Sequence, residues 1–129
     1  MTRSALIALA LALFFGPATA QADYVDVIGG KLNEGCSLEK YLKLVDEFRG
    51  VMKENNYEYT VEILQPVTSE DLSIIWWIGR SKDFPTFAEG YTQWEKALSD
   101  SKSAEAKLNK KIVKCSTNVS RAGMLSRGD

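Results

Sequence analysis

The chain has 129 residues with 16 basic and 17 acidic side chains, a formal net charge of −1. The basic residues are spread along the chain, which excludes the electrostatic footprint of a nucleic-acid-binding protein. Histidine is absent, so Ser-His and Cys-His catalytic pairs, histidine-ligated zinc and histidine-ligated haem are excluded too. We therefore expect one small domain with a single core, no metal and no cofactor.

Residues 1–22 have the pattern of a secretory signal peptide. Arg3 supplies a positive charge, Ala5–Phe15 is an unbroken apolar run, and small residues then allow cleavage after Ala20 or Ala22. The run is shorter than the roughly 20 residues that span a bilayer. The sequence thus predicts a secreted or periplasmic protein that is free of the membrane once the signal is removed.

The first two elements of the mature chain differ in period. Asp23–Leu32 is rich in β-branched residues, ends in glycines and predicts a strand. From Ser37 to Asn55 apolar residues recur every three or four positions, which predicts an amphipathic helix with Cys36 or Ser37 at its N-cap.

Two strands are expected next. Tyr57–Leu64 alternates apolar and polar residues, as a half-buried strand does. Leu72–Arg80, "LSIIWWIGR", is apolar on both faces and follows a turn-rich stretch, so the two strands are predicted to form a hairpin.

The last third predicts a helix, a strand and a tail. A second helix is expected from about Pro85, with an aromatic stripe that includes Tyr91 and Trp94; residues 101–110 either prolong it or form a short helix. Lys111–Val119 is predicted to be the fourth strand, and residues 120–129 a loose C-terminal tail.

The element order β-α-β-β-α-β predicts a ferredoxin-like α+β sandwich over residues 23–119. This plan has a four-stranded antiparallel sheet, two helices on one face, and the first and third strands at the centre. We expect the first strand to run parallel to the third and antiparallel to the fourth.

The cysteines offer a check on this plan. An exported chain with Cys36 and Cys115 favours one disulfide, the alternative being two free buried thiols. The plan brings the start of the first helix close to the early part of the fourth strand, so it predicts that these cysteines bond. Val113, Cys115 and Thr117 would then face the helices.

The apolar third strand bears on assembly. Helices cover one face of the predicted sheet, so one of Trp76 and Trp77 would lie on an open face. Monomers seldom leave a large apolar patch exposed. The sequence therefore predicts a homodimer with a twofold interface, without deciding which tryptophan lies in it.

The third strand and following helix carry a family resemblance. "SIIWWIGRS" followed by "FPTFAEGYTQWEKAL" resembles the dimeric α+β barrel superfamily, which includes antibiotic-biosynthesis monooxygenase-like proteins; the similarity of pattern and element order covers Tyr24–Val119. The resemblance implies two subunits packed sheet to sheet, with a small-ligand pocket between sheet and helices in each. This chain differs from the haem-using branches of the superfamily because it has no histidine, and it differs from most members because it carries a predicted export signal.

Candidate ligand-binding residues follow from this plan. An apolar pocket with a few polar tips would be lined by Tyr91 and Trp94, together with Trp76 or Trp77 and with Tyr57 or Tyr59. The alternative is that they simply form the core, since an aromatic stripe at helical spacing is usually packing.

Charged residues add a few weaker candidates. Asp26 interrupts an apolar strand and is a catalytic candidate as a buried base, or else a rim residue. Arg80 and Lys82 would bind an anionic ligand at the pocket mouth, or simply be solvated.

Two functions remain open. The first is an exported binding or structural protein with a hydrophobic pocket for a small molecule. The second is a cofactor-independent oxygenase-like enzyme acting on a small hydrophobic substrate. A cavity beside Trp94 that Asp26 enters would favour the enzyme, whereas the lack of an acid–base or nucleophile–base pair favours binding.

Overall fold

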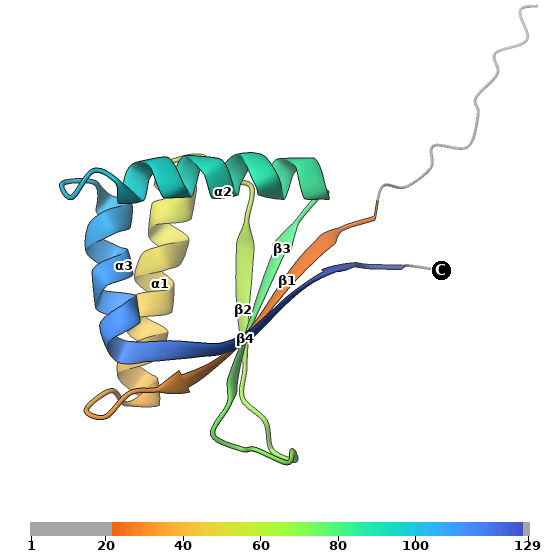
Figure 1. Cartoon of the computed structure of the whole chain (residues 1–129), viewed down its shortest axis with the longest axis vertical. Helices are drawn as coiled ribbons and strands as arrows, with labels where there is room; N and C mark the ends of the chain where they lie inside the picture. Colours follow the sequence, from red (N-terminus) through yellow and green to blue (C-terminus); the bar gives the residue numbers. More distant parts are fainter. Residues whose placement is uncertain (1–21, 128–129) are drawn as a thin grey trace, which may run out of the picture.

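The structure, a computed structural model, describes residues 22–127. A four-stranded sheet is covered on one side by three helices (Figure 1). The predicted signal peptide lies outside the described residues. Within residues 22–127, no helix is both long enough and apolar enough to cross a membrane.

The sheet has the predicted ferredoxin-like order. Its strands are β1 (Tyr24–Leu32), β2 (Thr60–Leu64), β3 (Ile75–Ser81) and β4 (Ser116–Leu125), arranged β2-β3-β1-β4. The central positions of β1 and β3 are confirmed. The expected parallel pairing of these two strands is wrong, because β1 runs antiparallel to both β3 and β4. The crossover through the first helix makes β2 parallel to β1, and the hairpin then reverses β3.

Helix α1 (Leu38–Glu54) matches the prediction closely. The Ser37 side chain caps it by accepting a hydrogen bond from the backbone N–H of Lys40 at 3.2 Å. Its apolar stripe supplies most of the core, with Val45 fully buried. Ile75 of β3 and, from the third helix, Leu108 and Cys115 complete that core.

The predicted second helical region forms two helices. Helix α2 (Phe84–Leu98) is capped by Asp83, and helix α3 (Ala104–Cys115) is capped by Ser103. Figure 1 shows α1 and α3 side by side, with α2 running across their ends and on above the sheet. The plan of two covering helices therefore becomes three.

The fourth strand begins later than predicted. Lys111–Cys115 is the end of α3, and β4 runs from Ser116 to Leu125, so the expected strand at Lys111–Val119 is wrong in its first half. Residues 120–125, expected to be a loose tail, pair with β1. The β-branched "KIVKC" segment is helical because it packs as the last turns of an amphipathic helix against α1, a tertiary contact that overrides strand propensity.

The disulfide between Cys36 and Cys115 is present, with Cα atoms 5.2 Å apart. It joins the start of α1 to the last residue of α3, so the expected orientation of Val113 and Thr117 toward the helices from a strand does not hold. Asn33 supports the same junction: its backbone N–H donates to the Cys115 carbonyl at 2.8 Å, and its side chain donates to the Lys114 carbonyl at 3.1 Å.

The two tryptophans of β3 lie on opposite faces of the sheet. Trp77 faces the helices, where its ring lies 4.7 Å from that of Phe48. Trp76 lies on the open face, where it covers Gly29 of β1 beside Ser120 of β4. Trp77 thus belongs to the subunit interior, and Trp76 to the face that no helix covers.

Candidate functional site

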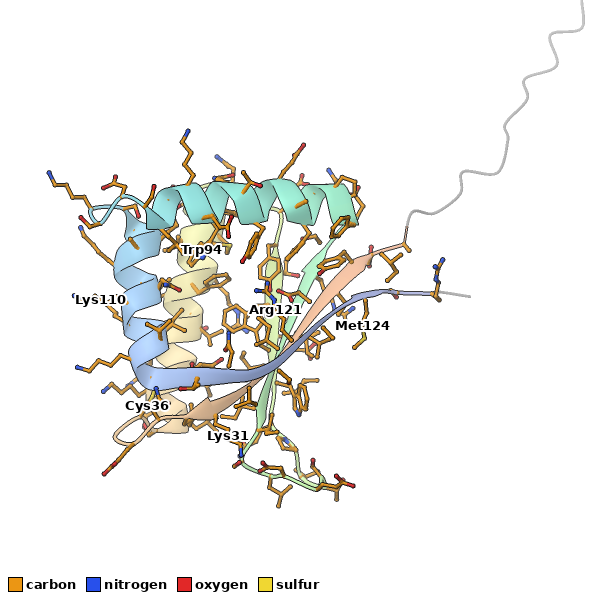
Figure 2. The ribbon with its side chains drawn as sticks, in the orientation of Figure 1. Lys31, Cys36, Trp94, Lys110, Arg121 and Met124 are labelled. Atoms are coloured by element: carbon orange, nitrogen blue, oxygen red, sulfur yellow. A yellow bond between two sulfur atoms is a disulfide. The ribbon has the colours of Figure 1, made fainter. Side chains whose placement is uncertain are left out.

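A cavity of about 340 Å³ lies between the inner face of the sheet and the helices. Helix α2 forms the roof of the cavity. No residue of α2 is fully buried, so its aromatic side chains face the cavity as well as the core. Aromatic side chains form a large part of the wall: Tyr41, Phe48, Tyr57, Tyr59, Trp77, Phe87, Tyr91 and Trp94. In Figure 2, Trp94 on α2 and Arg121 on β4 both lie in the space enclosed by helices and sheet.

Asp26 of β1 is the most buried polar residue of the site, with 1% of its surface exposed. Arg121 of β4 binds its carboxylate in a fork: Nε donates to Oδ1 at 2.9 Å and Nη2 donates to Oδ2 at 2.8 Å. The carboxylate holds the Arg121 pKa above its usual value. A buried carboxylate is costly unless paired, and this fork supplies the pairing.

Two aromatic donors complete the network around Asp26. The Tyr59 hydroxyl donates to Asp26 Oδ2 at 3.0 Å and accepts from Trp77 Nε1 at 2.8 Å. Burial, followed by the nearby negative charge of Asp26, raises the Tyr59 pKa well above its usual value. Tyr59 is therefore a neutral hydrogen-bond donor throughout the physiological range.

Two glycines make room for this arrangement. Gly79 of β3 and Gly123 of β4 lie directly beside Asp26 in the register, one on each side. A Cβ atom at Gly79 would overlap the Tyr59 phenol, and one at Gly123 would overlap the Tyr24 phenol. The missing side chains thus let two tyrosines lie flat over the sheet on either side of the carboxylate.

Arg121 also closes the gap between β4 and α2. Its guanidinium carbon lies 5.4 Å from the centre of the Tyr91 ring, a cation–π contact. Its side chain is 42% exposed, so it stands at the mouth of the cavity and not at its base. The guanidinium N–H groups that do not bind Asp26 donate to no acceptor within residues 22–127.

A second polar pair lies behind the wall at Tyr57. The Tyr57 hydroxyl donates to Glu105 Oε1 at 3.1 Å, and Glu105 is only 6% exposed. Burial first, and then the hydrogen bond to Glu105, raises the Tyr57 pKa to about 12. Glu105 lies in the first turn of α3, where the helix dipole favours its negative charge.

The structure brings together most of the candidates predicted from the sequence. Those that line the cavity are Asp26, Tyr57, Tyr59, Trp77, Tyr91 and Trp94. Trp76 and Arg80 do not line it, because they share the other face of β3, where Arg80 is exposed. Lys82 instead pairs with Glu58 at 2.8 Å.

Sequence reasoning missed Arg121 and Glu105. The sequence pattern predicts a loose tail at Arg121 because it predicts the fourth strand several residues too early. A signal was present: Asp26 in an apolar strand requires a cation, and "SRAGML" alternates Arg121, Gly123 and Leu125 on one face. Within residues 22–127, no group of three or more His, Cys, Asp or Glu side chains is placed to hold a metal ion.

Fold and cavity together define a ferredoxin-like α+β protein with a lined space between sheet and helices. No family model matches the chain. No curated protein matches it either.

Solved structures resemble it at low sequence identity. A crystal structure of At3g17210 from Arabidopsis thaliana is 11% identical with a TM-score of 0.54, and the match covers 82% of this chain and 95% of that one. This likeness shows the fold alone.

Two bacterial structures match less closely. A dimeric ferredoxin-like protein of unknown function from Bacteroides fragilis is 11% identical with a TM-score of 0.45, covering 84% of this chain and 98% of that one. A protein from Bacteroides thetaiotaomicron, described as a possible oxidoreductase, is 9% identical with a TM-score of 0.47, covering 83% and 100%.

Proposed function

We propose that this chain is an exported protein that binds a small, largely apolar molecule in the cavity beneath α2. The carrying observation is the cavity itself: its volume of about 340 Å³ falls within the usual range for small-molecule sites, and its wall combines aromatic rings with polar and charged side chains. The space opens to solvent beside Arg121 and Glu95, so a small molecule can reach it from outside.

The chemistry of Asp26 favours binding over catalysis. Asp26 enters the cavity, as the oxygenase alternative requires, but both of its oxygens already accept hydrogen bonds from Arg121, and Oδ2 accepts from Tyr59 as well. A general base needs an oxygen within reach of the substrate proton. The network instead holds Asp26, Arg121 and Tyr59 together as a fixed part of the cavity wall.

We further propose that two copies pair through the open faces of their sheets, as the resemblance to dimeric α+β barrels implies. By strand alternation the open face carries Val25 and Val27 of β1, Trp76 and Ile78 of β3, and Met124 of β4, which is 51% exposed. Exposed apolar patches of this kind commonly mark interfaces. Export is proposed from the N-terminal pattern and agrees with the disulfide.

A cavity-filling variant tests the binding proposal. Gly90 of α2 lines the cavity, and a Cβ there would lie at an ordinary 3.8 Å from Tyr57, so Gly90→Leu fills the space without a backbone clash. Gly50 of α1 has open space around it, so Gly50→Leu is the matched control. Both changes favour the helix.

The probe is N-phenyl-1-naphthylamine, a neutral aromatic dye whose fluorescence rises in an apolar site. We expect the dye to bind the native chain and Gly50→Leu alike, and Gly90→Leu to lose binding with a thermal midpoint no lower than that of the native chain. Equal dye binding by a folded Gly90→Leu would overturn the proposed site.

A further inference from the structure

The cavity wall carries more negative than positive charge. Three carboxylates line it, Asp26, Glu58 and Glu95, against a single cation, Arg121. Arg121 is neutralised by Asp26 at 2.8 Å, and Glu58 by Lys82 at 2.8 Å. Glu95 on α2 has no salt-bridge partner within residues 22–127. The wall is therefore left with a negative charge and no free cation.

One cationic side chain, Arg121, already lies in the cavity wall. The Arg121 guanidinium sits over the Tyr91 ring at 5.4 Å and is bound by the buried carboxylate of Asp26. An aromatic face together with a carboxylate is the combination that recognises amines and quaternary ammonium groups. This corner shows that the walls stabilise positive charge.

A second corner has two aromatic rings with a carboxylate behind them and no cationic side chain paired with that carboxylate in the described part of the chain. The ring centres of Trp94 and Tyr57 lie 6.3 Å apart, and the Tyr57 hydroxyl donates to the buried carboxylate of Glu105 at 3.1 Å. A phenol that donates to a carboxylate becomes more electron-rich, because hydrogen bonds in a low-dielectric interior polarise their donors. Its ring face then attracts a cation more strongly. No lysine or arginine forms a salt bridge with Glu105 in the described part of the chain.

We infer that the ligand of this cavity is an organic cation, an amine or quaternary ammonium compound whose charge lies against Trp94 and Tyr57. The inference rests on the proposed function and specifies its ligand class. Glu105 does not touch the ligand; it is a positioning residue that acts through the Tyr57 phenol.

Two probes of equal shape separate charge from apolar fit. Benzyltrimethylammonium and its uncharged carbon isostere, neopentylbenzene, are each used to displace N-phenyl-1-naphthylamine at 0.15 M salt, where exposed charges are screened beyond about 8 Å. We expect the cation to displace the dye at a concentration about tenfold lower than the isostere, which lies between the effects of an exposed and of a desolvated cation–π contact. Equal displacement, or a preference for neopentylbenzene, overturns the cation inference and leaves the proposed function standing.

Charge variants test the origin of the preference. Glu105→Gln should abolish most of the preference for benzyltrimethylammonium while leaving the neopentylbenzene affinity unchanged. If Glu105→Gln fails to fold, Glu95→Gln is used instead. It removes a carboxylate at an exposed position of α2 at the edge of the cavity, and it should also lower the preference for benzyltrimethylammonium. Glu47→Gln, outside the cavity, makes the same change in net charge and should keep the preference.

The outcomes separate the two proposals. A cation preference that survives in both cavity variants overturns the inference. Failure of the dye to bind the native chain overturns the proposed function, and this inference with it.

Discussion

Arg121 and Asp26 lie 95 positions apart in the chain, yet the guanidinium of one binds both carboxylate oxygens of the other, at 2.9 and 2.8 Å. The pair joins an edge strand to a central strand on the face that the helices cover. It also joins the mouth of the cavity to its interior, because Arg121 is half-exposed and Asp26 is almost fully buried.

Removing Arg121 should destabilise the protein through Asp26. Arg121→Met leaves the buried carboxylate without a cation, and we expect a loss of about 2 kcal/mol in the free energy of unfolding, less than the 3–5 typical of fully buried pairs because Arg121 is partly solvated. Urea denaturation measures it. Lys43→Met, which breaks the exposed pair with Glu39, should cost under about 0.5 kcal/mol; equal losses in the two variants would contradict the structural role of the Arg121 fork.

Gly79 should not tolerate a side chain. Gly79→Ala places a methyl group where the Tyr59 phenol lies, which forces the phenol off Asp26. Overpacking of this kind costs about 1–3 kcal/mol. Gly30→Ala is the control, because the nearest atom to its new Cβ would be 3.6 Å away. Denaturation midpoints that fall equally for both glycines would show that the overlap with the Tyr59 phenol is not the cause of the loss.

The disulfide should contribute strongly to stability. It spans a sequence separation of 79 residues, for which the chain-entropy model gives roughly 4 kcal/mol. We expect Cys36→Ser with Cys115→Ser to unfold at a much lower urea concentration than the oxidised chain. Mass spectrometry after alkylation should find no free thiol in the native protein, and two alkylated cysteines would contradict the presence of the disulfide.

Trp76 and Trp77 should respond differently to a charge. Trp76→Glu places a carboxylate on the open face, so sedimentation should show a soluble, folded monomer, whereas we expect the native chain to sediment as the proposed dimer. Trp77→Glu buries the charge beside Phe48 and should unfold the chain instead. A native chain that sediments as a monomer at micromolar concentration would refute the proposed dimer.

Alkaline pH should weaken the fold through Tyr57 and Tyr59. The folded pKa of Tyr57 is about 12, against 10.0 for an ordinary tyrosine, and burial raises that of Tyr59 as well. Their stabilising contribution is complete below pH 10 and is lost as pH rises through the folded pKa values.

The free energy of unfolding should therefore fall above pH 10. Tyr57→Phe should make this fall less steep, measured by urea denaturation at pH 9, 10 and 11 with absorbance at 295 nm reporting ionisation. The same slope in both proteins would mean that Tyr57 ionises normally in the folded state.

Much of the fold was predictable because local periods carry it. The three-and-four spacing from Leu38 to Met52 places α1 almost to the residue, with Ser37 at its cap. The second half was harder to predict. "KIVKC" has strand propensity but is helical, because its apolar side packs against α1. The strand β4 therefore begins later than the sequence predicts, and it includes Arg121, which the sequence pattern assigns to the tail.

The candidate site divides in the same way. Its aromatic lining could be predicted from the stripe of α2 and from strand alternation. The partners of Asp26 could not, because Arg121 and the flanking Gly79 and Gly123 become neighbours only through strand register.

The sequence by itself determined the order of the elements except for the separate helix α3, and an apolar strand with a tryptophan on each face, since composition and period are local properties. Only the tertiary structure decided that Trp77 faces inward, that Trp76 faces outward, and that Arg121 neutralises Asp26 at the mouth of a cavity. The physical reason is register: a shift of one residue in a strand sends every side chain to the other face, and no local pattern sets that shift between strands far apart in the chain.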